Sequence, residues 1–123
     1  MPRVSPAARP GRLPKRTPRR ESEIVQATLQ ALRAYGIVCW RNQSGMVVGE
    51  HKGKPWVIRM GTTGVSDIVG FRKTDGRIVC VECKVPDRDP TPAQAAFLTS
   101  VTRADGLAFV ARSLDDVKQH LHL

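Results

Sequence analysis

The chain lacks the features that mark secreted and membrane-spanning proteins. It has no apolar run approaching the roughly 20 residues that a spanning helix needs, and no apolar core of a secretory signal. Its three cysteines, an odd number, do not favour a disulfide framework. Cys80 and Cys83 have the spacing of a redox or zinc pair, but a strand places them on opposite faces. We therefore expect an intracellular protein with reduced cysteines and no membrane partner.

Acidic residues are absent from the first twenty positions. Residues 1–20 carry seven arginines and lysines, and proline recurs at every fourth position from 2 to 18. Proline at this spacing excludes a helix, so we predict a disordered basic arm followed by a single domain over residues 21–123. The formal net charge is +9, but the 13 basic and 11 acidic residues outside the arm leave that domain at only +2.

The basic arm has two interpretations. Its cations can attract nucleic-acid phosphates by releasing counterions, in which case Arg16, Arg19 and Arg20 are candidate phosphate contacts. Alternatively, it is a solvated leader without a binding role. The sequence leaves both open.

Helical and strand patterns alternate along the rest of the chain. A 3.6-residue period predicts a first helix from Glu21 to Tyr35, stopped by Gly36. Thr91 and Pro92 are typical of a helix start, and that helix is expected to reach about Ala104. Short strands are predicted at 37–41 and 107–111, further strands after Asp67 and around Glu82, and a last helix at 114–120 capped by Ser113. The predicted fold class is α/β.

Residues 42–60 are harder to assign. Met46–Val48 and Trp56–Ile58 predict a small hairpin around a loop from Gly49 to Pro55. Lys52 and Lys54 make that loop basic, so both are candidate nucleic-acid contacts. The segment could serve as a substrate wedge, a dimer arm or a plain hairpin. Trp40 and Trp56 are better explained by packing than by base stacking.

Two acidic positions lie fifteen residues apart. Asp67 precedes one predicted strand, and Glu82, Cys83 and Lys84 lie in the next. Side chains alternate along a strand, so Glu82 and Lys84 share a face. If the two strands are antiparallel neighbours, two carboxylates and an ammonium converge. Carboxylates are ligands for Mg²⁺ or Mn²⁺, and this combination suits phosphodiester hydrolysis. A surface ion pair on an edge strand is the simpler alternative.

Three short motifs together resemble the VRR-type nuclease domain of the PD-(D/E)xK superfamily. They are Gly64-Val65-Ser66-Asp67-Ile68, Glu82-Cys83-Lys84 and Thr91-Pro92-Ala93-Gln94, and the resemblance covers roughly residues 21–112. One departure is Ser66, which stands where the superfamily pattern has proline. The neighbour of the aspartate only shapes the backbone, so the metal chemistry should be unaffected.

The resemblance implies a restriction-endonuclease-like αβββαβ core, with a central mixed sheet flanked by helices. It also implies a Mg²⁺- or Mn²⁺-dependent endodeoxyribonuclease. Asp67 and Glu82 would ligate one or two ions together with the backbone carbonyl of Cys83, and Lys84 would assist the attacking water. Gln94 would sit beside Lys84 at the active site. Thr91 and Gln94 also form a capping box, which alone could explain the glutamine.

The family usually adds an acid from the first helix, and this chain offers Glu21 and Glu23. Glu21 lies four residues before Val25 and seven before Thr28, so it extends the buried stripe by one turn. Glu23 lies on a weaker row, and either acid could simply favour the helix dipole. We prefer Glu21 and keep Glu23 as the alternative.

Stand-alone members of this family occur in bacteriophages and resemble Holliday-junction resolvases that act as dimers on branched DNA. We therefore expect a structure-selective homodimeric endonuclease in the cytoplasm or nucleoid of a bacterial or phage-infected cell. The alternative is a non-catalytic protein with the same fold, either binding nucleic acid or serving as a packaging or repair accessory. Metal-dependent cleavage distinguishes the two.

Overall fold

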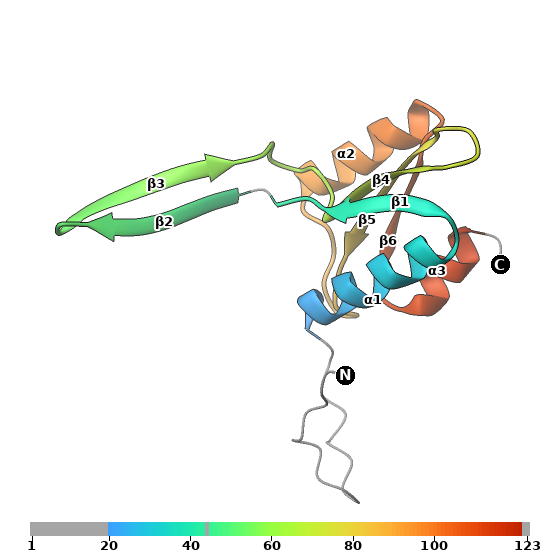
Figure 1. Cartoon of the computed structure of the whole chain (residues 1–123), viewed down its shortest axis with the longest axis horizontal. Helices are drawn as coiled ribbons and strands as arrows, with labels where there is room; N and C mark the ends of the chain where they lie inside the picture. The colour runs from blue at the N-terminus through green and yellow to red at the C-terminus, as the bar shows by residue number, and fades with distance from the viewer. Residues whose placement is uncertain (1–19, 44, 122–123) are drawn as a thin grey trace, which may run out of the picture.

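The computed structural model describes residues 20–43 and 45–121 (Figure 1). The basic arm predicted at the start of the chain, including Arg16 and Arg19, lies outside these residues except for Arg20. The elements are α1 (Glu21–Ala34), β1 (Ile37–Arg41), β2 (Gly45–His51), β3 (Lys54–Met60), β4 (Ile68–Arg72), β5 (Ile78–Cys83), α2 (Pro92–Arg103), β6 (Leu107–Ala111) and α3 (Leu114–His120). The expected α/β class is confirmed.

Four strands form a mixed central sheet in the order β1-β4-β5-β6. β4 pairs antiparallel with both β1 and β5, whereas β6 is parallel to β5. A parallel neighbour requires a crossover, and α2 provides it between β5 and β6. β2 and β3 form a separate two-stranded sheet, inserted between β1 and β4 (Figure 1).

Helices cover both faces of the central sheet. α1 and α3 pack on one face, and α2 packs on the other against β5 and β6. Alternate residues of β5 follow this division: Val79, Val81 and Cys83 belong to the core under α1, while Cys80 packs under α2. The two cysteines thus lie on opposite faces, as expected. Glu82 lies two residues after Cys80, so its side chain points to the same face of the sheet. It is the second-last residue of β5.

The helix boundaries follow the local sequence signals, with one exception. Gly36 has φ of +85° directly after α1, and the Thr91 hydroxyl accepts a hydrogen bond from the Gln94 nitrogen at the start of α2. Ser113 occupies the N-cap of α3, but in the described structure its side chain makes no capping hydrogen bond. Asp116 instead accepts a 2.8 Å bond from the Arg112 nitrogen.

The inserted hairpin is longer than predicted. Its strands pair from Gly45↔Met60 to His51↔Lys54, so only Lys52 and Gly53 form the turn. Both have positive φ, 52° and 77°, as a two-residue type I′ turn requires. The expected loop from Gly49 to Pro55 is therefore wrong, because strand pairing continues through it.

Among the described residues, no helix combines the length and apolar character needed to cross a membrane.

Candidate metal centre

Three carboxylates meet at one end of the central sheet. Glu21 comes from the first turn of α1, Asp67 immediately precedes β4, and Glu82 lies near the end of β5. Each offers an oxygen, and these oxygens all lie within 4.8 Å of one another. The antiparallel pairing of Ile68 with Val81 brings the start of β4 against the end of β5, which explains why Asp67 and Glu82 converge.

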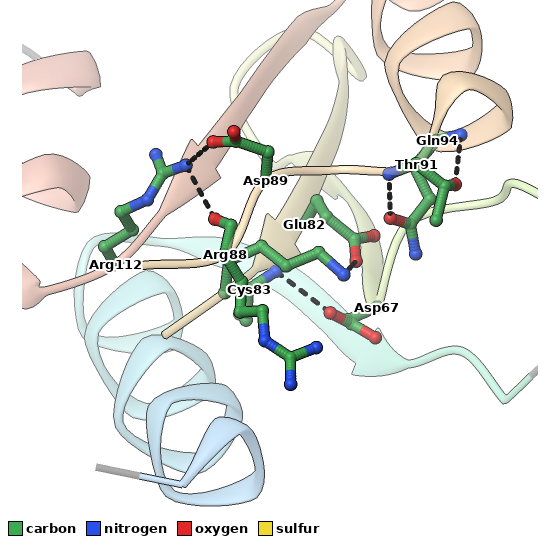
Figure 2. Close-up of polar contacts among 9 residues, drawn as sticks. Asp67, Glu82, Cys83, Arg88, Asp89, Thr91, Gln94 and Arg112 are labelled. Carbon is green, nitrogen blue, oxygen red and sulfur yellow. Dashed lines mark hydrogen bonds and ion pairs between the residues drawn. The ribbon is translucent and has the colours of Figure 1, made fainter. Parts of the chain in front are cut away.

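Backbone contacts fix the position of Asp67. The backbone nitrogen of Cys83 donates a 2.9 Å hydrogen bond to Asp67 Oδ2 (Figure 2). The Asn42 backbone nitrogen donates a 2.7 Å bond to the Asp67 carbonyl. The Asn42 side-chain amide donates a longer bond, 3.4 Å, to the Ser66 carbonyl. Asp67 is therefore held between the end of β1 and the end of β5.

Glu82 is the most buried of the three carboxylates. Only 1% of its side chain is exposed, and neither carboxylate oxygen has a hydrogen-bond partner among the described residues. Its nearest countercharge is Lys84 Nζ, which forms an ion pair 3.5 Å from Oε2. Burial, reinforced by the charge of Asp67, raises the pKa of Glu82 to about 7, although the Lys84 ammonium opposes the rise.

Such a carboxylate fits a cation ligand. A buried charge that lacks hydrogen bonds costs several kcal/mol unless another charge compensates it. One lysine cannot balance three neighbouring acids. Oxygen donors that converge from separate elements, one of them buried without a hydrogen bond, are suited to a hard divalent ion such as Mg²⁺ or Mn²⁺. The donor set of Glu21, Asp67 and Glu82 therefore fits the predicted metal.

Lys84 lies at the edge of this cluster. Its side chain is 12% exposed, and its backbone nitrogen donates a 3.1 Å hydrogen bond to the Ala111 carbonyl of β6. That bond continues the β5–β6 ladder by one residue and keeps Lys84 on the same face as Glu82. The ammonium is thus placed between the carboxylates and the surface.

Cys83 contributes its backbone rather than its thiol. The side chain is buried in the α1-side core. Burial, with smaller effects from the charges of Asp67, Glu82 and Glu21, raises the pKa of the thiol to about 12, against a lowering effect of Thr28. The thiol stays protonated at neutral pH and is not a nucleophile. The nitrogen orients Asp67, and the carbonyl remains a predicted ligand.

The two acids of the first helix have different positions. Glu21 joins the cluster with Asp67 and Glu82. Glu23 is exposed, and its Oε1 accepts a 3.3 Å hydrogen bond from the backbone nitrogen of Arg20, which caps the helix start. The geometry therefore favours Glu21 over Glu23 as a metal ligand.

Gln94 satisfies the capping box at the start of α2. Its Oε1 accepts a 2.8 Å hydrogen bond from the Thr91 nitrogen, and its own nitrogen donates to Thr91 Oγ1 at 3.2 Å. Figure 2 shows the carboxamide below the helix start, on the side of the carboxylates. The cap thus fixes the orientation of this side chain, whatever else it contacts.

Three of the predicted basic contacts lie among the described residues. Arg20 is exposed at the start of α1, directly before Glu21 in the chain. Lys52 and Lys54 are exposed at the tip of the β2–β3 hairpin, which projects from the body (Figure 1). The role of these residues as nucleic-acid contacts stays a prediction.

Sequence reasoning missed three supporting residues. Asn42 holds the backbone before β4, but nothing in its surroundings marks it. Arg112 donates to the Arg88 carbonyl at 2.9 Å and to Asp89 Oδ1 at 3.0 Å, tying β6 to the loop after the site (Figure 2). Gly64 has φ of +92°, and a Cβ there would lie 2.9 Å from the Ala93 carbonyl oxygen. Of these, only Gly64 had a signal, as the first residue of the motif that ends in Asp67 and Ile68.

Comparison with protein-family models and with curated proteins found no match to this chain. The resemblance to the VRR-type nuclease domain therefore stays a prediction that rests on the sequence motifs.

Proposed function

We propose that the protein is a Mg²⁺- or Mn²⁺-dependent endodeoxyribonuclease that hydrolyses phosphodiester bonds. The observation that carries this proposal is the buried Glu82 carboxylate, which has no hydrogen-bond partner among the described residues and lies within 4.8 Å of oxygens of Asp67 and Glu21. Lys84, 3.5 Å from Glu82, completes the set of acids and cation that such hydrolysis uses.

Asp67, Glu82 and Glu21 would hold the ion, with the Cys83 carbonyl as a further ligand. When bound, the ion polarises a phosphoryl oxygen and makes a bound water more acidic. Asp67 is already oriented for this role, because the Cys83 nitrogen donates to Oδ2. Glu82 is buried, and one of its oxygens lies within 4.8 Å of oxygens of the other two acids.

Lys84 supplies the positive charge. Its ammonium lies 3.5 Å from Glu82 Oε2 and has three N–H donors. It can hold the attacking water by hydrogen bonding and stabilise the negative charge that develops on the phosphate oxygens. Gln94, on the same side of the α2 start, would present its carboxamide to the substrate while its oxygen keeps the helix cap.

The arrangement of elements supports a restriction-endonuclease-like core. With the hairpin set aside, the order α1, β1, β4, β5, α2, β6 follows the αβββαβ pattern, with three antiparallel strands and one parallel strand. The carboxylates lie where such a sheet brings the start of one strand against the end of the next.

For the substrate, we propose branched DNA such as a Holliday junction, cut by a homodimer. Resolving a junction requires two symmetric cuts, whereas each chain has one cluster of acids among its described residues. Two-fold pairing of chains provides the second site. The net charge of +9 favours a polyanionic substrate, with selectivity from its shape rather than from base edges.

A cleavage panel tests this proposal. Four-way junction, flap, fork, duplex and single-stranded DNA are incubated with Mg²⁺ or Mn²⁺, using the wild type, Glu82→Gln and an Asp75→Asn control. Asp75 is an exposed acid paired with Arg72, away from the site. We expect metal-dependent cleavage, strongest on the junction, that Glu82→Gln loses and Asp75→Asn keeps. Junction binding without cleavage by the wild type would instead indicate a non-catalytic nucleic-acid-binding protein.

A further inference from the structure

The β2–β3 hairpin exposes apolar side chains on both faces. Val48 pairs with Val57 and shares one face with it, while Trp56 and Ile58 lie on the other face. All four are exposed, with Val57 at 57%. Figure 1 shows the hairpin projecting away from the body as a long two-stranded ribbon. Isolated two-stranded hairpins are marginal in water, so these surfaces call for a partner.

The body carries a second uncovered apolar surface, on the central sheet. We call it the open sheet face; it consists of Val38, Trp40, Phe71 and Ile78. Strand register places Val38, Phe71 and Ile78 in one row across β1, β4 and β5, with Trp40 in the next row of the same face. α2 packs on this side of the sheet mainly against β5 and β6, which leaves Trp40 of β1 and Phe71 of β4 exposed. Phe71 is 41% exposed there, and Trp40 and Ile78 are also exposed.

We propose that two copies of this chain form a homodimer in which each hairpin lies on the open sheet face of the partner. One surface projects and the other is flat, so a single chain carries both halves of the contact. Its own hairpin points away from its own body, as Figure 1 shows. Reciprocal exchange covers one face of each hairpin and the open sheet face of each partner in a closed two-fold assembly, with each contact occurring twice.

The dimensions agree with this exchange. Each hairpin strand has seven residues, about 24 Å of extended chain, whereas β1 and β4 have five residues each, about 17 Å. The hairpin is therefore long enough to cross the whole open sheet face. It leaves the body beside Asn42 and the loop leading to Asp67, so the exchange would also bind the two carboxylate clusters into one assembly.

The composition of the hairpin favours a protein surface over nucleic acid as its partner. Phosphate binding needs cations along the contacting surface. Between Val48 and Ile58 the lysines are confined to Lys52 and Lys54 at the tip, and Glu50 lies beside them. The side chains between tip and base that the structure describes are mainly apolar, as in the core of a dimer interface.

This inference rests on the proposed function only for the expectation of a homodimer, and its test measures association without cleavage. Sedimentation equilibrium of the full chain, freed of nucleic acid, compares the wild type with Val57→Lys and Phe71→Asp. Both positions are exposed, so neither change disturbs the core. We expect a dimeric wild type and at least tenfold weaker self-association for each variant. Leu114→Asp, at a 44% exposed residue on α3, is the matched control and should stay dimeric.

Mixing the two variants tests reciprocity. A dimer of one Val57→Lys chain and one Phe71→Asp chain keeps one unaltered contact and gains one in which lysine faces aspartate. The mixture should therefore associate more tightly than either variant alone. A monomeric wild type, or an effect confined to one of the two surfaces, would overturn the proposal. The proposal would also be overturned if Val57→Lys weakened DNA binding and left self-association unchanged. Glu82→Gln should remain dimeric, which separates this result from failure of the nuclease proposal.

Discussion

The Cys83 backbone nitrogen and the Asp67 carboxylate are joined by a 2.9 Å hydrogen bond across the ends of β5 and β4. The bond holds one oxygen of Asp67. It connects two short motifs through residues that lie sixteen positions apart in the chain. The donor belongs to the backbone, so Cys83 can be replaced by any residue other than proline without removing this donor. The two motifs thus form one structural unit around the candidate metal ligands.

Replacing Asp67 with asparagine separates its charge from this hydrogen bond. The amide oxygen can still accept from Cys83, so the fold should be retained. The loss of one negative ligand weakens metal binding, and metal-ion catalysis contributes several kcal/mol, so cleavage should fall by about 100-fold or more. Unchanged thermal unfolding with lost cleavage is the expected result. Full activity of Asp67→Asn would show that the Asp67 carboxylate is not needed for cleavage.

Glu82 should make the stability of the metal-free protein depend on pH. Its pKa rises from 4.5 to about 7 on folding, so the folded state holds an extra proton between these values. The stabilisation is present below the lower value and is lost as pH rises through the upper one. Glu82→Gln removes this loss and should stabilise the metal-free protein at about pH 8 by roughly 2–3 kcal/mol.

Urea unfolding of wild type and Glu82→Gln in a chelator checks this difference. It should shrink as the pH falls toward 5, because the Glu82 carboxyl is then protonated in the folded state and increasingly so in the unfolded state. Other titrating groups, such as Asp75, are common to both proteins and cancel in the comparison. A difference that did not vary with pH would mean that the Glu82 carboxyl does not take up a proton on folding.

Two substitutions distinguish the helix-capping role of Thr91 and Gln94 from a role of Gln94 in cleavage. Thr91→Ala removes the hydroxyl that caps α2 and should cost about 1 kcal/mol of stability while leaving cleavage of the folded protein intact. Gln94→Glu retains an oxygen acceptor for the Thr91 nitrogen, so stability should change little. It loses the amide donor and adds an acid, so cleavage should fall. If Gln94→Glu cleaves normally, the glutamine serves only the cap.

Gly64 should be sensitive to an added methyl group. Its φ of +92° disfavours any L-residue, and the Cβ would press on the Ala93 carbonyl at the start of α2. Gly64→Ala should therefore cost more than about 1 kcal/mol. Gly76→Ala is the matched control, because its φ is +77° but its Cβ would meet open space. Equal losses in the two variants would show that the contact with Ala93 has no effect.

Much of the fold could be predicted because its signals are local. Gly36 and Thr91 mark helix boundaries through backbone conformation and capping, which depend on neighbouring residues alone. The alternation around Glu82 correctly separated the two faces of β5. The hairpin was underestimated because Glu50 and His51 look like loop residues, whereas the positive φ of Lys52 and Gly53 lets pairing continue to the tip.

The site was less predictable because it depends on tertiary contacts. Helical spacing ranked Glu21 above Glu23, and the structure brings Glu21 to Asp67 and Glu82. No sequence pattern shows that Asn42 grips the backbone at Asp67, or that Arg112 ties β6 to the loop after β5. Lys52 and Lys54 were candidates because of their charge; the structure places them at the hairpin turn, and their contact with nucleic acid stays a prediction.

The most direct test of the central claim is a calorimetric titration of the protein with Mn²⁺ at about pH 7, near the pKa of Glu82. The wild type and Asp75→Asn should bind the ion with release of protons, detected by repeating the titration in buffers of different ionisation enthalpy. Asp67→Asn and Glu82→Gln should lose most of the affinity. Binding that survives in Glu82→Gln, or no binding by the wild type, would contradict a metal centre at these three carboxylates.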